Sequence, residues 1–208
     1  MTFLALNLSE WASLATIIGA TAIGAFVMQA LIMHRQLKAD HERGRREKTV
    51  ELLTDFFKNQ KKEGPIARKI TEHLSESQCR DMLAQQSFTV PIKLRKQLIQ
   101  FFGENIKIDD DDKEITLTEA NSAELRYHIL CYLNSLEMVL IAWQYSIVDR
   151  NIIETQLSYL FKPSEGHEIL KSFRIAAGNE DAYPAIEIFF THLKNKRRDK
   201  LIEKANVA

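Results

Sequence analysis

Three polar side chains that could do chemistry lie on one strip of an otherwise apolar stretch. On a helix of 3.6 residues per turn, Arg126 and Glu137 project within about 20° of each other, and Asn134 lies at the edge of the strip. A buried carboxylate needs a partner, because an unpaired buried charge costs about 3–5 kcal/mol. Arg126 lies about three turns away, so we expect the partner from another helix, such as Arg150 or Arg174, or from a neighbouring subunit. The strip is interpreted as a polar brace, with a binding site formed by its three residues as the alternative.

The other reactive residue types show no catalytic or metal-binding spacing. The six histidines match neither a Ser or Cys triad nor a zinc site. The acidic run from Asp109 to Glu114 lacks the central glycine and the alternate ligand spacing of a calcium loop, so we expect a solvated loop. Cys79 and Cys131 are expected to be unpaired. The sequence therefore predicts no metal and no cofactor.

The stretch that carries the polar strip is predicted to be the buried central helix of an all-α domain. It begins near Thr118 and runs to about Val148. Its apolar residues step by four and three positions in turn, which makes one complete helical face: Ile129, Leu133, Leu136, Leu140, Trp143 and Ile147. The chain has only 7 glycines and 4 prolines among 208 residues, which also favours helices. A connector is expected over 87–90, a helix from Pro91 to Phe102, and a loop over 104–117.

The N-terminal stretch is predicted to be a membrane anchor. The residues from Trp11 to Met33 carry no charge, and a helix of that length rises about 34 Å, enough to cross a hydrocarbon core of about 30 Å. Glu10 precedes this stretch, whereas six basic residues follow it between Arg35 and Lys48. Because positive flanks stay in the cytoplasm, the N-terminus is expected outside. A cleaved signal peptide is disfavoured, since no Lys or Arg precedes the apolar run.

The sequence thus predicts three parts within an all-α chain. A transmembrane anchor covers 1–34, a cytosolic stalk helix covers 35–60, and a helical-bundle cytosolic domain covers 61–208. The expected location is the bacterial inner membrane, crossed once, with the lipid bilayer as a partner. With 28 basic and 28 acidic residues the chain has no net charge, so the bulk charge predicts no nucleic-acid partner.

Small residues recur on two faces of the predicted anchor. Thr16, Ala20 and Gly24 share one face, and Ala15 and Gly19 lie on a second face about 120° away. Small side chains allow helix backbones to approach closely in lipid. We therefore expect these five residues to be contacts of a homo-oligomer, and two unlike faces suit a ring. The alternative is that Ala and Gly are simply common in membrane helices.

The segment from Arg126 to Asp149 resembles a family of uncharacterised bacterial proteins. It contains Leu133-Asn134-Ser135-Leu136-Glu137 followed by Ile147-Val148-Asp149, and a later Arg174 precedes an aromatic helix. That family has one N-terminal membrane helix and a helical cytosolic domain with a Leu-Asn-x-Leu-Glu core. The resemblance implies this layout but no known activity.

In size and layout the chain is also similar to the membrane accessory proteins of type VI CRISPR systems. That likeness implies assembly into a membrane pore and a ribonuclease-type motif, in which His follows Arg by four to six residues. Arg68 and His73 fit this spacing. In such HEPN-like ribonucleases the Arg binds phosphate and the His does acid–base work on the ribose 2′-OH. Lys69 departs from the pattern, because a small polar residue is usual at its place.

These observations lead to one principal hypothesis and two alternatives. The principal hypothesis is a non-enzymatic, self-assembling inner-membrane protein whose ring or pore-like oligomer perturbs the membrane, with a link to antiphage defence or CRISPR. Its helical domain would bind a protein or RNA partner. The first alternative is a ribonuclease that uses Arg68 and His73 as catalytic residues. The second is a passive membrane-tethered scaffold.

Overall fold

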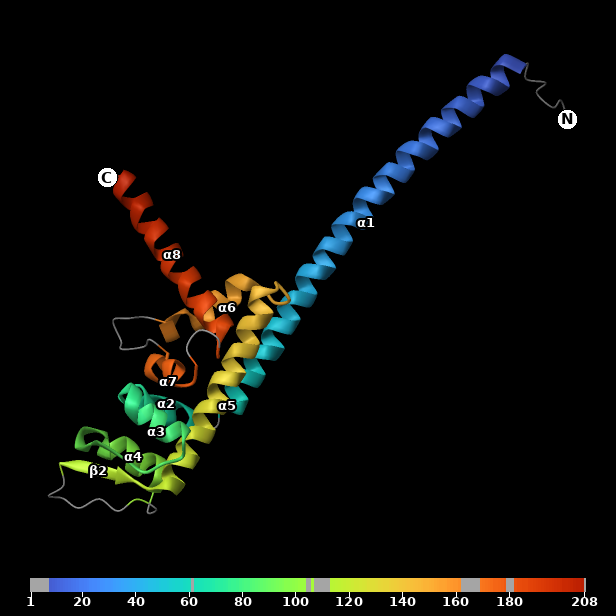
Figure 1. Cartoon of the computed structure of the whole chain (residues 1–208). Helices are drawn as coiled ribbons and strands as arrows, with labels where there is room; N and C mark the ends of the chain where they lie inside the picture. The colour runs from blue at the N-terminus through green and yellow to red at the C-terminus, as the bar shows by residue number, and fades with distance from the viewer. Residues whose placement is uncertain are drawn as a thin grey trace. The chain divides into compact units, whose positions relative to one another are not determined.

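The computed structural model describes residues 8–60, 62–103, 106, 113–161, 169–178 and 182–207. Over these ranges the chain is mostly helical and has a single two-stranded sheet (Figure 1). The prediction of an essentially all-α fold is confirmed. The chain divides into two compact units, Met1–Arg46 and Glu47–Ala208.

The first helix, α1, covers Leu8–Asn59 without a break. Among the residues described, no helix has the length together with the apolar character that crossing a bilayer requires. The predicted transmembrane anchor over 1–34 and the single-pass inner-membrane location are therefore wrong. The uninterrupted run of described, uncharged side chains covers only residues 19–33, with Gln29 inside it, and Arg35 and Lys38 follow soon after. The side chains at positions 14, 15, 17 and 18 lie outside the described residues.

The second unit contains the C-terminal end of α1 and all the later elements. Its longer helices are α2 (Glu63–Thr71), α3 (Glu76–Leu83), α4 (Arg95–Phe102), α5 (Glu119–Gln144), α6 (Arg150–Leu157), α7 (Lys171–Ala176) and α8 (Pro184–Val207). Short 3₁₀ helices η1 (Ile92–Leu94) and η3 (Ser158–Phe161) precede α4 and follow α6. Strands β1 (Phe88–Pro91) and β2 (Glu114–Leu117) form the sheet. The acidic residues 109–112 lie outside the described residues.

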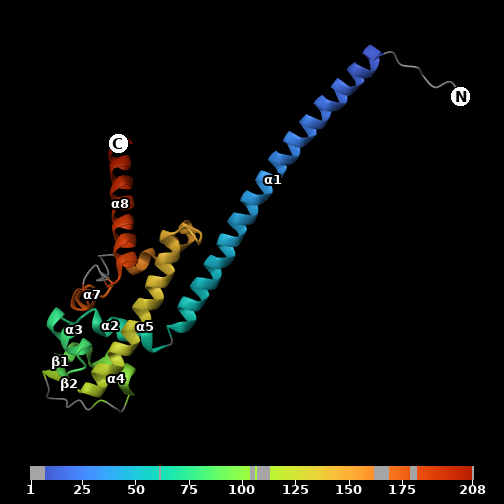
Figure 2. The same ribbon diagram turned by 45° about the vertical axis from the view of Figure 1, so that its right-hand side comes forward.

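Helix α5 is the central helix of this unit, as its sequence predicts. It packs against α2, α3 and α8 (Figure 2). Leu133, Leu136 and Leu140 of the predicted apolar face are completely buried. The helix ends earlier than expected: Tyr145 is the C-cap, and Ser146 adopts a left-handed conformation with φ 56°. Ile147, the last residue of the predicted face, is consequently exposed.

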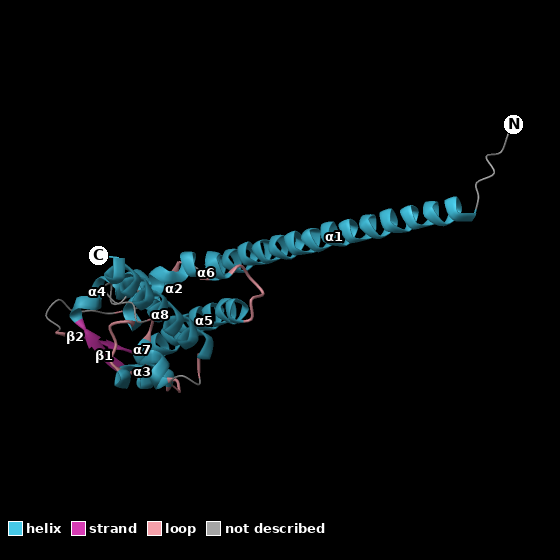
Figure 3. Ribbon diagram, turned by 90° about the horizontal axis from the view of Figure 1, so that it is seen from above, coloured by secondary structure: helices cyan, strands magenta, loops and turns pink. Residues whose placement is uncertain are grey.

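The sheet is the main element that sequence patterning did not predict. Strands β1 and β2 pair antiparallel, with Phe88 opposite Leu117 and Val90 opposite Ile115 (Figure 3). These four side chains face the core, whereas Thr89 and Thr116 are exposed. Residues 88–90 of the expected connector thus belong to β1, and residues 114–117 of the loop expected over 104–117 form β2. The helix expected from Pro91 begins instead as η1, because Pro91 belongs to β1.

Side-chain caps fix the starts of α3, α5 and α6. Ser75 and Thr118 each form a capping box, in which a hydroxyl accepts the backbone N–H three residues on. The Asp149 carboxylate accepts the N–H groups of Asn151 and Ile152 and begins α6. Gly103, with φ 60°, ends α4. These caps set the positions of the helices that carry the candidate sites.

Candidate functional site

Glu137 braces two helices rather than forming a site with the other residues of its strip. It is 9% exposed, and its two carboxylate oxygens accept the backbone N–H groups of Ala185 at 2.7 Å and Ile186 at 3.0 Å. These are N–H groups of the first turn of α8, where the helix dipole favours a negative charge. As expected, the partner of Glu137 comes from another helix. It is the backbone at the start of α8, however, and neither Arg150 nor Arg174.

The side chains of Arg126 and Asn134 do not form a common site with Glu137. The Asn134 side chain is exposed, and the buried Nε atom of Arg126 has no hydrogen-bond partner among the described residues. Arg174 donates instead to the carbonyl of Ile169 at 3.0 Å and to Glu187 at 2.9 Å. The three predicted binding residues are thus in three different environments, which favours the interpretation of Glu137 as a structural brace.

Arg68 holds α2 against α5. Its Nε atom lies 3.2 Å from the carboxylate of Glu72, and its Nη1 atom donates to the hydroxyl of Tyr132 at 3.3 Å. Tyr132 is buried, and burial raises the pKa of its hydroxyl, an effect that Arg68 opposes. The guanidinium group is thus engaged within the fold.

His73, the second residue of the predicted ribonuclease pair, is not brought to Arg68. Its ring is exposed, and Nδ1 lies 2.9 Å from the carbonyl oxygen of Lys69. No hydrogen bond joins His73 to Arg68 in the described part of the chain. The ribonuclease hypothesis stays a prediction, without support from this geometry.

The small residues of α1 serve no packing purpose that the described residues reveal. A Cβ atom added at Gly19 or Gly24 would meet nothing within 4 Å. Thr16 donates to the carbonyl of Ala12 at 2.9 Å, and Ala20 is exposed. The predicted contact at Ala15 involves a side chain outside the described residues.

A polar cluster that sequence reasoning missed lies between α5, α6 and α8. Glu154 is 8% exposed. Its carboxylate accepts Trp143 Nε1 at 3.3 Å and Lys196 Nζ at 2.5 Å, and His192 Nε2 lies 3.1 Å from it. Burial alone would raise the pKa of this carboxyl, but the bonds from Lys196 and Trp143 and the charges of Lys196 and His192 lower it overall.

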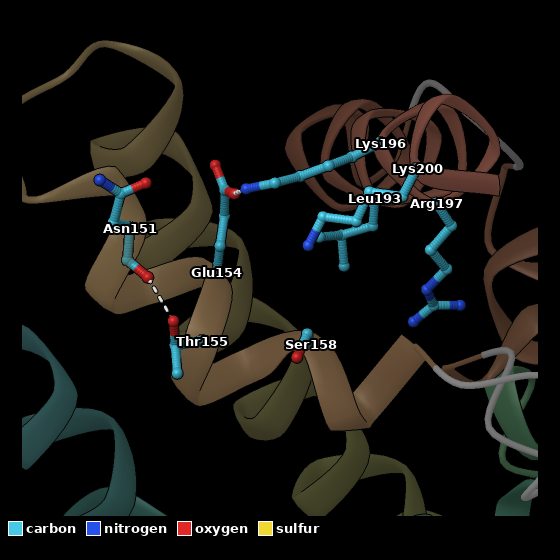
Figure 4. A pocket seen from close by; sticks show the side chains of 8 residues that line it. All are labelled: Asn151, Glu154, Thr155, Ser158, Leu193, Lys196, Arg197 and Lys200. Carbon is cyan, nitrogen blue, oxygen red and sulfur yellow. Dashed lines mark hydrogen bonds and ion pairs between the residues drawn. The ribbon is translucent and has the colours of Figure 1, made fainter. Parts of the chain in front are cut away.

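The cluster borders a pocket of about 550 Å³ between α6–η3 and α8. It is lined by Asn151, Glu154, Thr155, Ser158, Leu193, Lys196, Arg197 and Lys200. Figure 4 shows the basic side chains extending from α8, with Lys196 reaching the carboxylate of Glu154. In the sequence only the basic run from Lys194 to Lys200 points to this pocket, because the four lining residues of the other wall, Asn151 to Ser158, lie some 40 positions earlier in the chain.

No match is found among protein-family models, curated proteins or solved structures. In the part of the chain that the structure describes, no group of His, Cys, Asp and Glu side chains is arranged to hold a metal ion. Cys79 is buried and Cys131 exposed, and both are free thiols.

Proposed function

We propose that this chain is a non-enzymatic, self-assembling protein in which residues 16–44 of α1 form a parallel coiled coil with a second copy. The single observation that carries the proposal is an uncharged stripe along α1 whose residues alternate by four and three positions. In heptad terms these residues occupy the a and d positions: Thr16, Ala20, Ile23, Val27, Ala30, His34, Leu37, His41 and Gly44. We call this stripe the seam.

The seam stays uncharged in the part of α1 where the other faces carry charged residues. Between Arg35 and Arg46 the chain carries seven charged residues, and none falls on the seam. Within this charged segment the seam residues Leu37, His41 and Gly44 stay free of Asp, Glu, Lys and Arg, which is typical of a helix that meets another helix along that face. The other faces of this segment are those of a solvated helix.

The apolar side chains of the seam are exposed in the single chain. Ile23 is 68% exposed, Val27 52% and Leu37 54%. Burying an aliphatic side chain of this size stabilises an interface by about 1.5–3 kcal/mol. Apolar patches of this kind mark interaction surfaces, and a second copy of the same seam is their matching partner.

The glycines of α1 favour the same conclusion. A glycine inside a helix costs about 1 kcal/mol relative to alanine, and α1 contains Gly19, Gly24 and Gly44. At each of them a Cβ atom would meet open space, so the fold of the single chain does not require glycine there. Close approach of a second helix backbone at Gly44, a seam position, is a physical reason for one of them.

The charges beside the seam favour a parallel arrangement of two identical helices. Asp40 occupies a g position and Arg45 the e position five residues later. In a parallel coiled coil a g residue faces the following e residue of the partner helix, so Asp40 of each copy would meet Arg45 of the other. Val27 at a and Leu37 at d are residue types that favour two strands.

Replacing Val27 by lysine tests the proposal, with Ile32→Lys as the matched control. Both wild-type side chains are about half exposed, but Ile32 lies on the face opposite the seam. We expect Val27→Lys to weaken dimerisation of the full chain at least tenfold, because tenfold corresponds to about 1.4 kcal/mol and burial of valine contributes at least that much. Sedimentation equilibrium measures the change. A monomeric wild-type chain, or equal effects of the two variants, would contradict the proposal.

A further inference from the structure

We infer that the pocket between α6–η3 and α8 binds a small phosphate-bearing molecule of nucleotide size. Its lining brings together three cations from one helix and hydroxyl and amide groups from a second segment. The pocket is separate from the seam, so this inference does not depend on self-assembly. A pocket of about 550 Å³ falls within the range of about 300–1,000 Å³ that is usual for small-molecule sites.

The charge of the lining favours an anion. Lys196, Arg197 and Lys200 contribute three positive charges, and Glu154 contributes the one negative charge of the lining. The Glu154 carboxylate is already bonded to Trp143 and Lys196 and lies beside His192. With Lys196 paired to this carboxylate, Arg197 and Lys200 leave the lining with a net positive charge.

Two of the cations are held in place before any ligand arrives. Lys196 is fixed by Glu154, and Arg197 donates through Nη1 to the carbonyl of Phe161 at 3.3 Å. A guanidinium group has five N–H donors, so Arg197 keeps donors for a ligand after this bond is made. Side chains that are already ordered lose less entropy on binding, which distinguishes this pocket from a solvated run of lysines.

The opposite wall offers neutral hydrogen-bonding groups. Ser158 is half-buried and Asn151 exposed, and both line the pocket. The Thr155 hydroxyl donates to the carbonyl oxygen of Asn151 at 2.8 Å. Its own oxygen can therefore still accept a hydrogen bond from a ligand. Phosphate oxygens would lie against Lys196, Arg197 and Lys200, and the neutral wall would contact the hydroxyls of an attached sugar.

Isothermal titration of the full chain with adenosine 5′-monophosphate and with inorganic phosphate tests the inference. Lys200→Ala is the main variant, since Lys200 is exposed and its removal leaves the core intact. Lys194→Ala is the matched control: the same charge change on an exposed residue of α8 that does not line the pocket. We expect the monophosphate to bind the wild type more tightly than inorganic phosphate, Lys200→Ala to weaken it about tenfold or more, and Lys194→Ala to leave it unchanged.

Three results would overturn the inference. The first is no heat of binding for the monophosphate at millimolar concentration. The second is an equal loss in the Lys194→Ala control, which would indicate attraction by the net charge of α8 rather than a pocket. The third is binding of a single-stranded oligoribonucleotide that exceeds the monophosphate and depends equally on Lys194 and Lys200, which would indicate an extended nucleic-acid surface. Arg197→Ala, checked for folding by circular dichroism, should reproduce the loss seen for Lys200→Ala.

Discussion

At the scale of single residues, Glu154 is a buried carboxylate whose ionised form is stabilised by hydrogen bonds and neighbouring charges. Its carboxylate has little exposure to water, which by itself disfavours ionisation. Lys196 and Trp143 donate to it and His192 lies beside it, and together they lower its pKa below the ordinary value of 4.5. The ionised cluster therefore contributes to the free energy of unfolding.

Glu154→Gln should remove a pH-dependent part of stability. Since the folded-state pKa is lowered, the contribution of Glu154 is fully present above about pH 4.5 and is lost as the pH falls through the folded-state value. We expect wild type to be more stable than Glu154→Gln near neutral pH, with the difference shrinking at acidic pH. Urea denaturation across this range measures it. Glu124→Gln, at an exposed position of α5, is the control, and a difference between wild type and Glu154→Gln that does not change with pH would contradict the account.

At the scale of elements, the carboxylate of Glu137 ties α5 to the start of α8. Its two backbone partners are N–H groups that have no partner within their own helix. Glu137→Gln replaces a charged acceptor of two hydrogen bonds by an amide that accepts with one oxygen. We expect a loss of about 2 kcal/mol in the free energy of unfolding, because hydrogen bonds to charged groups contribute about 1.5–3 kcal/mol.

Asn134→Ala, on an exposed position of the same helix, is the control for Glu137→Gln. Surface substitutions of this kind usually change stability by less than about 0.5 kcal/mol. If both variants unfolded at the same urea concentration as the wild type, Glu137 would not be the brace described here.

Helices could be predicted from this sequence because their signals are local. The apolar face of α5 and the caps at Ser75, Thr118 and Asp149 each depend on residues within a few turns. The sheet was missed because Phe88–Pro91 and Glu114–Leu117 are each four residues long, too short for a period of two to stand out. The two strands are separated by residues 92–113, so no pattern of neighbouring residues indicates that they pair.

The candidate sites are harder to predict from the sequence, because each is formed by contacts between distant parts of the chain. Glu137 was correctly expected to find its partner on another helix, but a backbone N–H group has no sequence signature. The pocket combines residues near 151–158 with residues near 193–200, and no spacing rule connects those segments. The apolar N-terminal stretch predicts a membrane anchor, which the described helices do not support.

At the scale of the whole molecule, self-association and ligand binding would belong to different segments of the chain. Residues 16–44 would join two copies through the seam, and the unit Glu47–Ala208 would present the basic pocket. Each copy would then carry its own pocket, so a dimer would offer two equivalent sites. The central claim is the parallel, in-register pairing of α1.

Disulfide cross-linking tests that claim most directly. Leu37→Cys in a Cys131→Ser background places a thiol at a d position, where equivalent residues of parallel helices face each other. Under mild oxidation we predict a covalent dimer of the full chain, measured by non-reducing electrophoresis. Gln36→Cys, one residue away on the outside of the coiled coil, should cross-link far less. Absence of the Leu37→Cys dimer, or equal cross-linking of both variants, would contradict the account.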